Sequence, residues 1–176
     1  HISDLLSIKY WVIIGCKYKG CTGLTEIVIP NGVKELNSDL FSECSNLRNV
    51  VIPNSVNKIG YGAFGECSNL QNIVIPHSVD TIGVAAFSGC SNLLNITIPG
   101  SVKFIGESAF GACNKLTNVV LPNGLKTIER STFYACENLE SVVIPHSVEL
   151  IGESAFGFCP KLKRVEIPQN GNLKKI

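Results

Sequence analysis

The stretch LQNIVIPHSVDTIGVAAFSGCSN, residues 70–92, decides the fold, because its pattern returns along the chain every 23 residues. Three residue types keep this period independently of one another. Proline recurs at Pro30, Pro53, Pro76, Pro99, Pro122, Pro145 and Pro168. Cysteine recurs at Cys21, Cys44, Cys67, Cys90, Cys113, Cys136 and Cys159, and phenylalanine at Phe41, Phe64, Phe87, Phe110, Phe133 and Phe156. Three columns with one period indicate an array of structural repeats.

A single repeat holds too few apolar residues to form a core of its own. In residues 70–92 these are Leu70, Ile73, Ile75, Val79, Ile82, Ala86, Phe87 and Cys90. Stacked repeats bury such residues against the next copy and so share one continuous core. We therefore expect one elongated domain of about seven coils, in which residues 1–23 form a degenerate N-terminal repeat and residues 24–176 form the regular repeats, the last one incomplete.

The order of residues within a repeat predicts the local structure. The alternation of Ile73 and Ile75 is typical of a short strand with its isoleucines inward, and Pro76 ends that strand because proline cannot donate to a ladder. The segment from Val79 to Gly83 predicts a second extended run. The A-F-x-x-C segment that follows predicts a tight helical or 3₁₀ corner. Strands one period apart run in the same direction, so they predict a parallel sheet with one short strand per coil.

A glycine column accompanies the second extended run at Gly60, Gly83, Gly106 and Gly152. Asn37 and Glu129 occupy the same position in other repeats. Asparagine can take a positive φ, whereas glutamate does so reluctantly. Close packing therefore explains this column better than a left-handed backbone does.

The composition excludes several classes of function. The 176 residues include 15 basic and 14 acidic ones, for a net charge of +1, and 45% are hydrophobic. A nucleic-acid partner is not expected, since such proteins concentrate a basic excess on one face. The apolar run from Tyr10 to Ile14 is too short to cross a bilayer, so we expect no membrane insertion by this segment. The absence of methionine predicts a processed product or a piece of a longer protein.

The I-x-I-P, I-G, A-F, C order at 23 residues resembles the BspA-like (Treponema pallidum type) leucine-rich repeat, with residues 24–168 matching almost without a gap. Departures are Thr132 for alanine, Glu129 for glycine and Leu121 for isoleucine. The resemblance implies an α/β leucine-rich-repeat solenoid, a right-handed stack that is mostly β with short helical or 3₁₀ corners. It also implies a cell-surface or secreted protein that adheres to host matrix proteins or to other cells.

The cysteines and histidines carry no pattern that indicates catalysis. Stacked cysteines would lie ~5 Å apart, within disulfide reach, but their column falls among inward apolar columns. Buried free cysteine behaves as a small hydrophobe, so we expect a reduced ladder, with Cys16, which is off the column, as the exception. His77 and His146 follow proline three coils apart and cannot share a metal ion. We expect no enzyme activity, no metal and no cofactor.

The outward strand positions are the candidate binding residues. They form two neighbouring columns, with Asn49, Asn72, Asn95, Asn118 and Ser141 in one and Val51, Val74, Thr97, Val120 and Val143 in the other. Glu26 and Val28 precede these columns, and Arg164 and Glu166 follow them. One interpretation is structural, since valine suits strands and stacked asparagines can bond along a column. The other is an uncharged, partly apolar strip that is available to a partner.

These observations favour a protein–protein interaction module, the ligand-binding repeat segment of an adhesin, with a protein ligand such as a host extracellular-matrix protein. Two alternatives stay open from the sequence. The repeats could select the substrate of a larger enzyme, or they could be an inert structural spacer.

Overall fold

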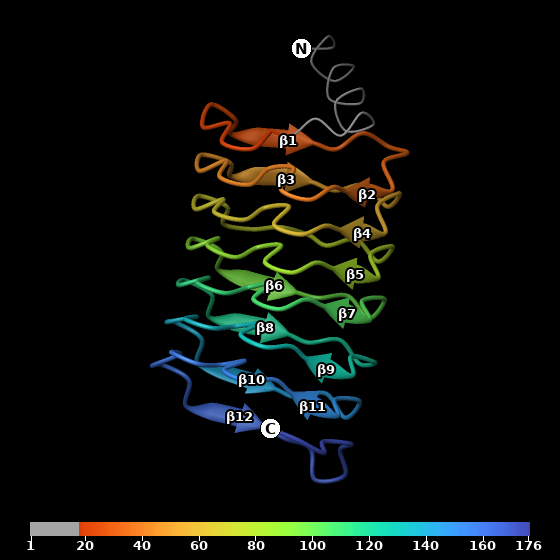
Figure 1. Ribbon diagram of the computed structural model, residues 1–176, viewed down its shortest axis with the longest axis vertical. Helices are drawn as coiled ribbons and strands as arrows, with labels where there is room; N and C mark the ends of the chain where they lie inside the picture. The colour runs from red at the N-terminus through yellow and green to blue at the C-terminus, as the bar shows by residue number, and fades with distance from the viewer. Residues whose placement is uncertain (1–17) are drawn as a thin grey trace.

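The computed structural model describes residues 18–176 as a stack of short coils, with β1 near the top of the stack and β12 near the bottom (Figure 1). The architecture is a parallel β-solenoid of about six turns with repeats of about 23 residues. The predicted solenoid and its parallel pairing are therefore confirmed, with about one turn fewer than expected. The proposed degenerate repeat at residues 1–23 and the off-column Cys16 lie mostly or wholly outside the described residues.

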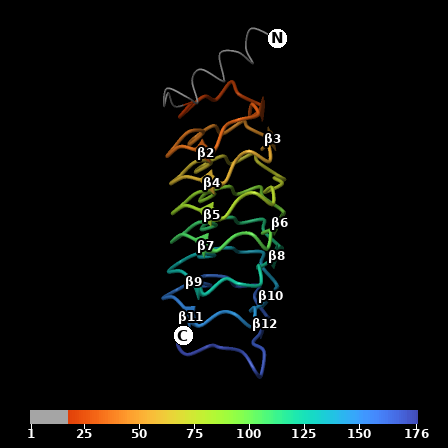
Figure 2. The same cartoon turned by 90° about the vertical axis from the view of Figure 1, so that its right-hand side faces the viewer.

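Most coils contribute two short strands rather than the single strand expected. The first strands form what we call the first ladder: β1 (Glu26–Val28), β3 (Asn49–Val51), β6 (Asn95–Thr97), β8 (Asn118–Val120), β10 (Ser141–Val143) and β12 (Arg164–Glu166). The V-x-x-I segments form the second ladder: β2 (Glu35–Leu36), β4 (Lys58–Ile59), β5 (Thr81–Ile82), β7 (Phe104–Ile105), β9 (Thr127–Ile128) and β11 (Leu150–Ile151). Figure 2 shows the two ladders along opposite sides of the stack.

Where two strands pair, they are counterparts one repeat apart. Asn95 of β6 lies beside Asn118 of β8, and Ile59 of β4 lies beside Ile82 of β5, both in parallel pairs. The first ladder is not continuous: β1 pairs with β3, β6 with β8 and β10 with β12. Residues 72–74 have no strand assignment, so this coil departs from the expected one strand per coil.

The inward columns build one core. The interior columns repeat the same or a similar apolar side chain in most coils, and the phenylalanines at positions 41, 64, 87, 110 and 133 are fully buried. Their rings stack with Tyr18 and Phe156 into one file, with centroids 5.3 to 5.6 Å apart and planes within 18° of parallel. Such pairs add about 0.5–1.5 kcal/mol each beyond the burial of their area. A coil is therefore stabilised mainly by its two neighbours.

The corners are not helical, which corrects the sequence expectation. No residue from 18 to 176 is in an α- or 3₁₀-helix, and the A-F-x-x-C segments form successive turns. The reason is visible around Phe87, where Ala85 and Gly89 both have a positive φ, of 53° and 74°. A left-handed residue reverses the direction of the local amides. The amides of Ala85, Phe87 and Gly89 consequently donate to Glu107, Ala109 and Gly111 of the next coil, at 2.8 to 2.9 Å. A helix would direct those amides back into the same segment.

The glycine column is explained by close packing, as expected. None of Gly60, Gly83, Gly106 and Gly152 has a positive φ. A Cβ on Gly83 would lie 2.6 Å from the carbonyl carbon of Gly60 in the preceding coil. Where Glu129 replaces glycine, the second ladder is interrupted: β2, β4, β5 and β7 form one sheet, and β9 and β11 form another. A side chain at this position therefore coincides with the one gap in the second ladder among the described strands.

The C-terminal tail continues the second ladder with a shifted register. Leu150 of β11 forms an isolated parallel bridge with Lys175 rather than with Leu173, which lies one repeat away. The amide of Ile151 donates to the Lys175 carbonyl at 3.0 Å, and the amide of Lys174 donates to the Glu149 carbonyl at 2.9 Å. In the sequence, the V-x-x-I pattern of Val148 and Ile151 returns at Leu173 and Ile176, two residues later than the 23-residue period, and this delay appears as a two-residue shift in pairing.

We predict that Gly83→Ala destabilises the protein by about 1–3 kcal/mol, because the added methyl would overlap backbone atoms of the preceding coil that cannot move independently. Urea unfolding followed by circular dichroism would measure the change. Gly100→Ala is the matched control, since a Cβ at Gly100 meets nothing within 4 Å, and it should leave the midpoint nearly unchanged. Equal unfolding midpoints for the two variants would refute the packing explanation of the column.

Candidate functional site

The outward columns of the first ladder form an exposed strip, as the sequence predicted. Val74 is 79% exposed, and Val51, Val120 and Val143 are each more than half exposed. In the neighbouring column, Asn49, Asn72, Asn95 and Asn118 are exposed, Thr97 is exposed in the valine column, and Ser141 is half-buried. The strand burial pattern of exposed, buried, exposed places both columns on the solvent side of each strand. The structure therefore brings all ten candidate residues to one face.

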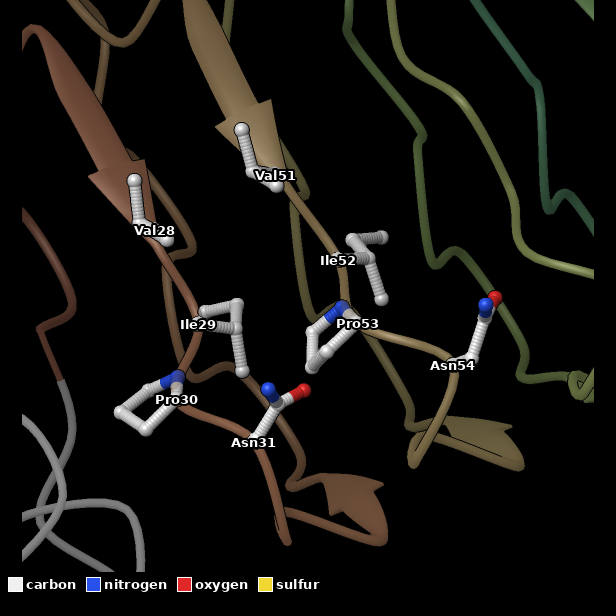
Figure 3. A pocket seen from close by; sticks show the side chains of 8 residues that line it. All are labelled: Val28, Ile29, Pro30, Asn31, Val51, Ile52, Pro53 and Asn54. Carbon is white, nitrogen blue, oxygen red and sulfur yellow. The ribbon is translucent and has the colours of Figure 1, made fainter.

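Three shallow, open hollows lie along the edge of this strip, where strands pass into the proline turns. The first, of about 600 Å³, lies between the coils of β1 and β3 (Figure 3). In Figure 3, Val28 and Val51 lie at the ends of the two strands, and Pro30 and Pro53 lie beside Asn31 and Asn54 at the turns. The hollow therefore combines valine from the strand with an amide from the turn.

The other two hollows repeat this arrangement further along the stack. One, of about 330 Å³, includes Val74, Thr97 and His77, and the other, of about 250 Å³, includes Val120, Val143 and Asn123. Asn31, Asn54, His77 and Asn123 are not among the sequence candidates, because a polar residue directly after proline is typical of a turn. Their signal was present in the sequence as a polar residue following proline in several repeats. The candidate site therefore extends from the strand face onto the turn edge.

The exposed asparagine amides are largely unused by the protein itself. Among the described residues, no hydrogen bond engages the side chain of Asn49, Asn72 or Asn118, and Asn95 only accepts a bond from Thr117 at 3.3 Å. The column of bonded asparagines that the sequence allowed here forms instead at the S-N-L position of the repeats. There Asn69 and Asn92 donate to the carbonyls of Ser45 and Ser68, at 2.8 and 2.6 Å. Structural bonding thus accounts for that other column and leaves the strip's amides available.

Charge is confined to the ends of the strip. Glu26 lies at one end, and Arg164 and Glu166 form an exposed ion pair of 3.1 Å at the other. The ten candidate residues between them carry no charge. A partner that binds the middle of the strip would therefore meet methyl groups and amides rather than charged groups.

The second ladder is different in character, because ion pairs connect its coils. Lys58 pairs with Glu35 at 2.7 Å, and Glu149 pairs with both Lys126 and Lys174 at 2.9 and 2.6 Å. Hydrogen bonds from these two lysines lower the pKa of Glu149 to about 2, so its carboxylate is ionised at neutral pH. Phe104 is 44% exposed on this ladder. The charged side chains of the second ladder are thus engaged with one another.

The cysteine column forms a file of thiol hydrogen bonds rather than a reactive site. The seven cysteines of the column, from Cys21 to Cys159, are free, and the five from Cys44 to Cys136 are buried. Each of these thiols donates to the carbonyl of the aromatic residue in the preceding coil, for example Cys90 to Phe64 at 3.2 Å. Burial raises the pKa of Cys67 and Cys136 to about 12, and it raises the pKa of Cys90 and Cys113 well above the ordinary value of a thiol. A protonated thiol is the state that can donate this bond.

Searches for other kinds of site were confined to the described part of the chain. No group of three or more histidine, cysteine or acidic side chains within residues 18–176 is arranged to hold a metal ion. Over the same residues, no helix has the length and apolar character needed to span a bilayer. His77 and His146 both lie exposed in turns, three coils apart.

Comparisons with known proteins find a matching repeat family and similar solved structures of leucine-rich repeat proteins. The family model described as "BspA type Leucine rich repeat region (6 copies)" matches residues 12–114 and 82–176. A leucine-rich repeat protein from Bacteroides ovatus is 38% identical, with a TM-score of 0.83 over 86% of this chain and 39% of its own. The T. pallidum leucine-rich repeat protein is 32% identical, with a TM-score of 0.76 over 83% of this chain and 68% of its own.

A leucine-rich repeat protein from Eubacterium ventriosum is 27% identical, with a TM-score of 0.62 over 88% of this chain and 49% of its own. No curated protein matches the chain. The chain thus spans about two fifths of the Bacteroides ovatus structure and about half of the Eubacterium ventriosum one.

We predict that the five buried thiols react with iodoacetamide only when the protein unfolds, because both burial and a raised pKa suppress the thiolate. Cys21 and Cys159, which are half-buried, should be alkylated first among the described cysteines. Mass spectrometry after timed alkylation at pH 8 would resolve the order. Detection of disulfides between adjacent repeats in the native protein would contradict the arrangement.

Proposed function

We propose that this chain, which belongs to the BspA-type leucine-rich-repeat family, is a protein–protein interaction module. Its ligand would dock on the outward face of the first ladder and on the adjoining proline turns. The observation that supports this most directly is the uncharged strip of exposed valines and unengaged asparagine amides, with hollows repeated along its edge. Solenoids commonly bind partners over such extended regular surfaces.

The energetics of the strip favour a protein partner over a small molecule. The hollows are shallow and open, whereas small-molecule sites enclose most of their ligand. A partner that crosses several coils can cover the valines and satisfy the amides of Asn49, Asn72 and Asn118 together. Burial of apolar area contributes about 25 cal/mol per Å², and each amide that gains a partner adds about 0.5–1.5 kcal/mol. Many weak contacts at regular spacing would then sum to useful affinity.

We further propose that the chain is the ligand-binding repeat segment of a cell-surface or secreted adhesin, with a host extracellular-matrix protein as its ligand. The family resemblance supports this location and partner. Substrate selection for a larger enzyme is the alternative, since the chain covers only part of the length of its structural relatives. The full-length sequence distinguishes the two, because an appended catalytic domain favours the enzyme and a surface anchor favours the adhesin.

We predict that the double variant Val74→Lys, Val120→Lys abolishes capture of any matrix protein that the wild type retains in a pull-down. Two ammonium groups would have to be desolvated against an apolar partner surface. Both valines are more than half exposed, so the fold should be unaffected, as circular dichroism would show. Wild-type affinity should depend only weakly on salt, because the middle of the strip is uncharged.

Phe104→Lys is the matched control, because it places a lysine on an exposed apolar position of the second ladder. It should bind as the wild type does. Retained binding by the double variant, together with loss of binding in Phe104→Lys or in a Lys103 variant, would place the partner on the second ladder and overturn the proposal.

A further inference from the structure

An aromatic hollow lies at a corner of the stack, away from the candidate strip. Its volume is about 560 Å³, and it is lined by Tyr134, Ala135, Glu137, Phe156, Phe158, Cys159 and Pro160. The rings of Tyr134 and Phe158 lie against one another with centroids 5.2 Å apart and planes inclined by 58°. Two inclined aromatic faces therefore border one open cavity.

The sequence departs from its repeat to build this hollow. Tyr134 occupies a column that from the second repeat onward is otherwise made of small residues, namely Ser42, Gly65, Ser88, Gly111 and Gly157, with Lys19 before them. A Cβ on Gly157 would come within 3.1 Å of the Tyr134 ring, so the glycine leaves space for that ring to lie over its coil. Phe158 follows Gly89, Ala112 and Ala135 in its column, in which the earlier repeats carry Glu43 and Glu66. Tyr134 and Phe158 are the aromatic residues of these two columns.

Phe158 lies at a position that is energetically unfavourable for phenylalanine. Its side chain is 77% exposed, and its φ of 55° is in the left-handed region, where bulky residues are uncommon. An exposed ring gains little from the core, so packing does not offset the backbone strain. The left-handed backbone belongs to every corner, since Glu66, Ala112 and Ala135 of the same column also have a positive φ, so the feature that the fold does not require here is the exposed ring.

The charge of the hollow indicates what it could bind. Glu137 is the one charged residue that lines it, and no ion pair of the described residues engages this carboxylate. The ammonium of Lys161, close in sequence, is committed to the amide oxygen of Asn138 at 2.6 Å. Two aromatic faces with one unpaired carboxylate are complementary to a cationic group, and a planar guanidinium both stacks on rings and bonds to carboxylates.

We propose that this corner is a second binding site, which takes an arginine side chain from a peptide or protein partner. The guanidinium would lie against the ring of Phe158 or Tyr134 and donate hydrogen bonds to the Glu137 carboxylate. The site is independent of the strip on the first ladder, because it shares no residue with the hollows there. It would add one charge-dependent contact to the uncharged contacts of the strip.

The test is an NMR titration with the peptide acetyl-Gly-Arg-Gly-amide and with its citrulline counterpart, which has the same shape without the charge. The arginine peptide should shift the ring signals of Tyr134 and Phe158 and bind at least about fivefold more tightly than the citrulline peptide. Equal affinity for the two peptides would overturn the assignment of a cationic ligand. Shifts that map to other residues would overturn the site.

Variants separate binding from folding. Phe158→Gly should abolish the binding while raising the thermal midpoint, because glycine adopts the left-handed conformation without strain. Glu137→Gln, a fully conservative change in shape, should weaken binding by about threefold. Tyr61→Ala, which removes an exposed tyrosine elsewhere on the stack, is the control and should bind normally, as should Val74→Lys, Val120→Lys. Unchanged binding in both Phe158→Gly and Glu137→Gln would contradict the proposal.

Discussion

The structure depends on one constraint: in most of the stack, every residue lies against its own counterpart in the next coil. A column is therefore occupied only by side chains that can pack against a copy of themselves. Phenylalanine does so by stacking, cysteine by donating its thiol to the preceding coil, and asparagine by bonding to a carbonyl one coil away. Glycine does so by leaving no side chain at all. Charged residues occur at the surface, where some of them alternate in sign along a column, as Arg130 does between Glu107 and Glu153.

This constraint explains why a surface can become a binding site here. The interior columns and most of the corners are committed to stacking, and the charges of the second ladder largely pair with one another. The outward columns of the first ladder contribute little to either purpose, because the amides of Asn49, Asn72 and Asn118 lack partners within the protein and the valines lie mostly in water. The stack thus holds these groups at a fixed spacing with their bonding capacity unused. A rigid, regular array of this kind loses little entropy when a partner binds.

The repeat register made much of the fold predictable from the sequence. Period and residue type were enough to place the core columns, the parallel pairing and the exposed strip. The close packing at Gly83 could be predicted because Glu129 occupies the same column. Glutamate adopts a positive φ only reluctantly, so a left-handed backbone could not explain the column. The corners were not predictable in the same way, because Ala85, Ser108 and Ser131 adopt a positive φ that their residue types do not signal. Hydrogen bonds to the next coil impose that conformation, so it is a property of the stack rather than of the local sequence.

The extent of the candidate site was also only partly predictable. The turn residues Asn31 and Asn123 line hollows together with strand valines, and their side-by-side position depends on how the proline turns fold back. The most direct test of the central claim is therefore to follow the side-chain amide signals of asparagine by NMR as a matrix-protein ligand binds. We expect the signals of Asn49, Asn72 and Asn118 to shift, and those of the carbonyl-bonded Asn69 and Asn92 to stay in place. Shifts of Asn69 and Asn92 with the other three unchanged would show that the partner binds elsewhere on the stack.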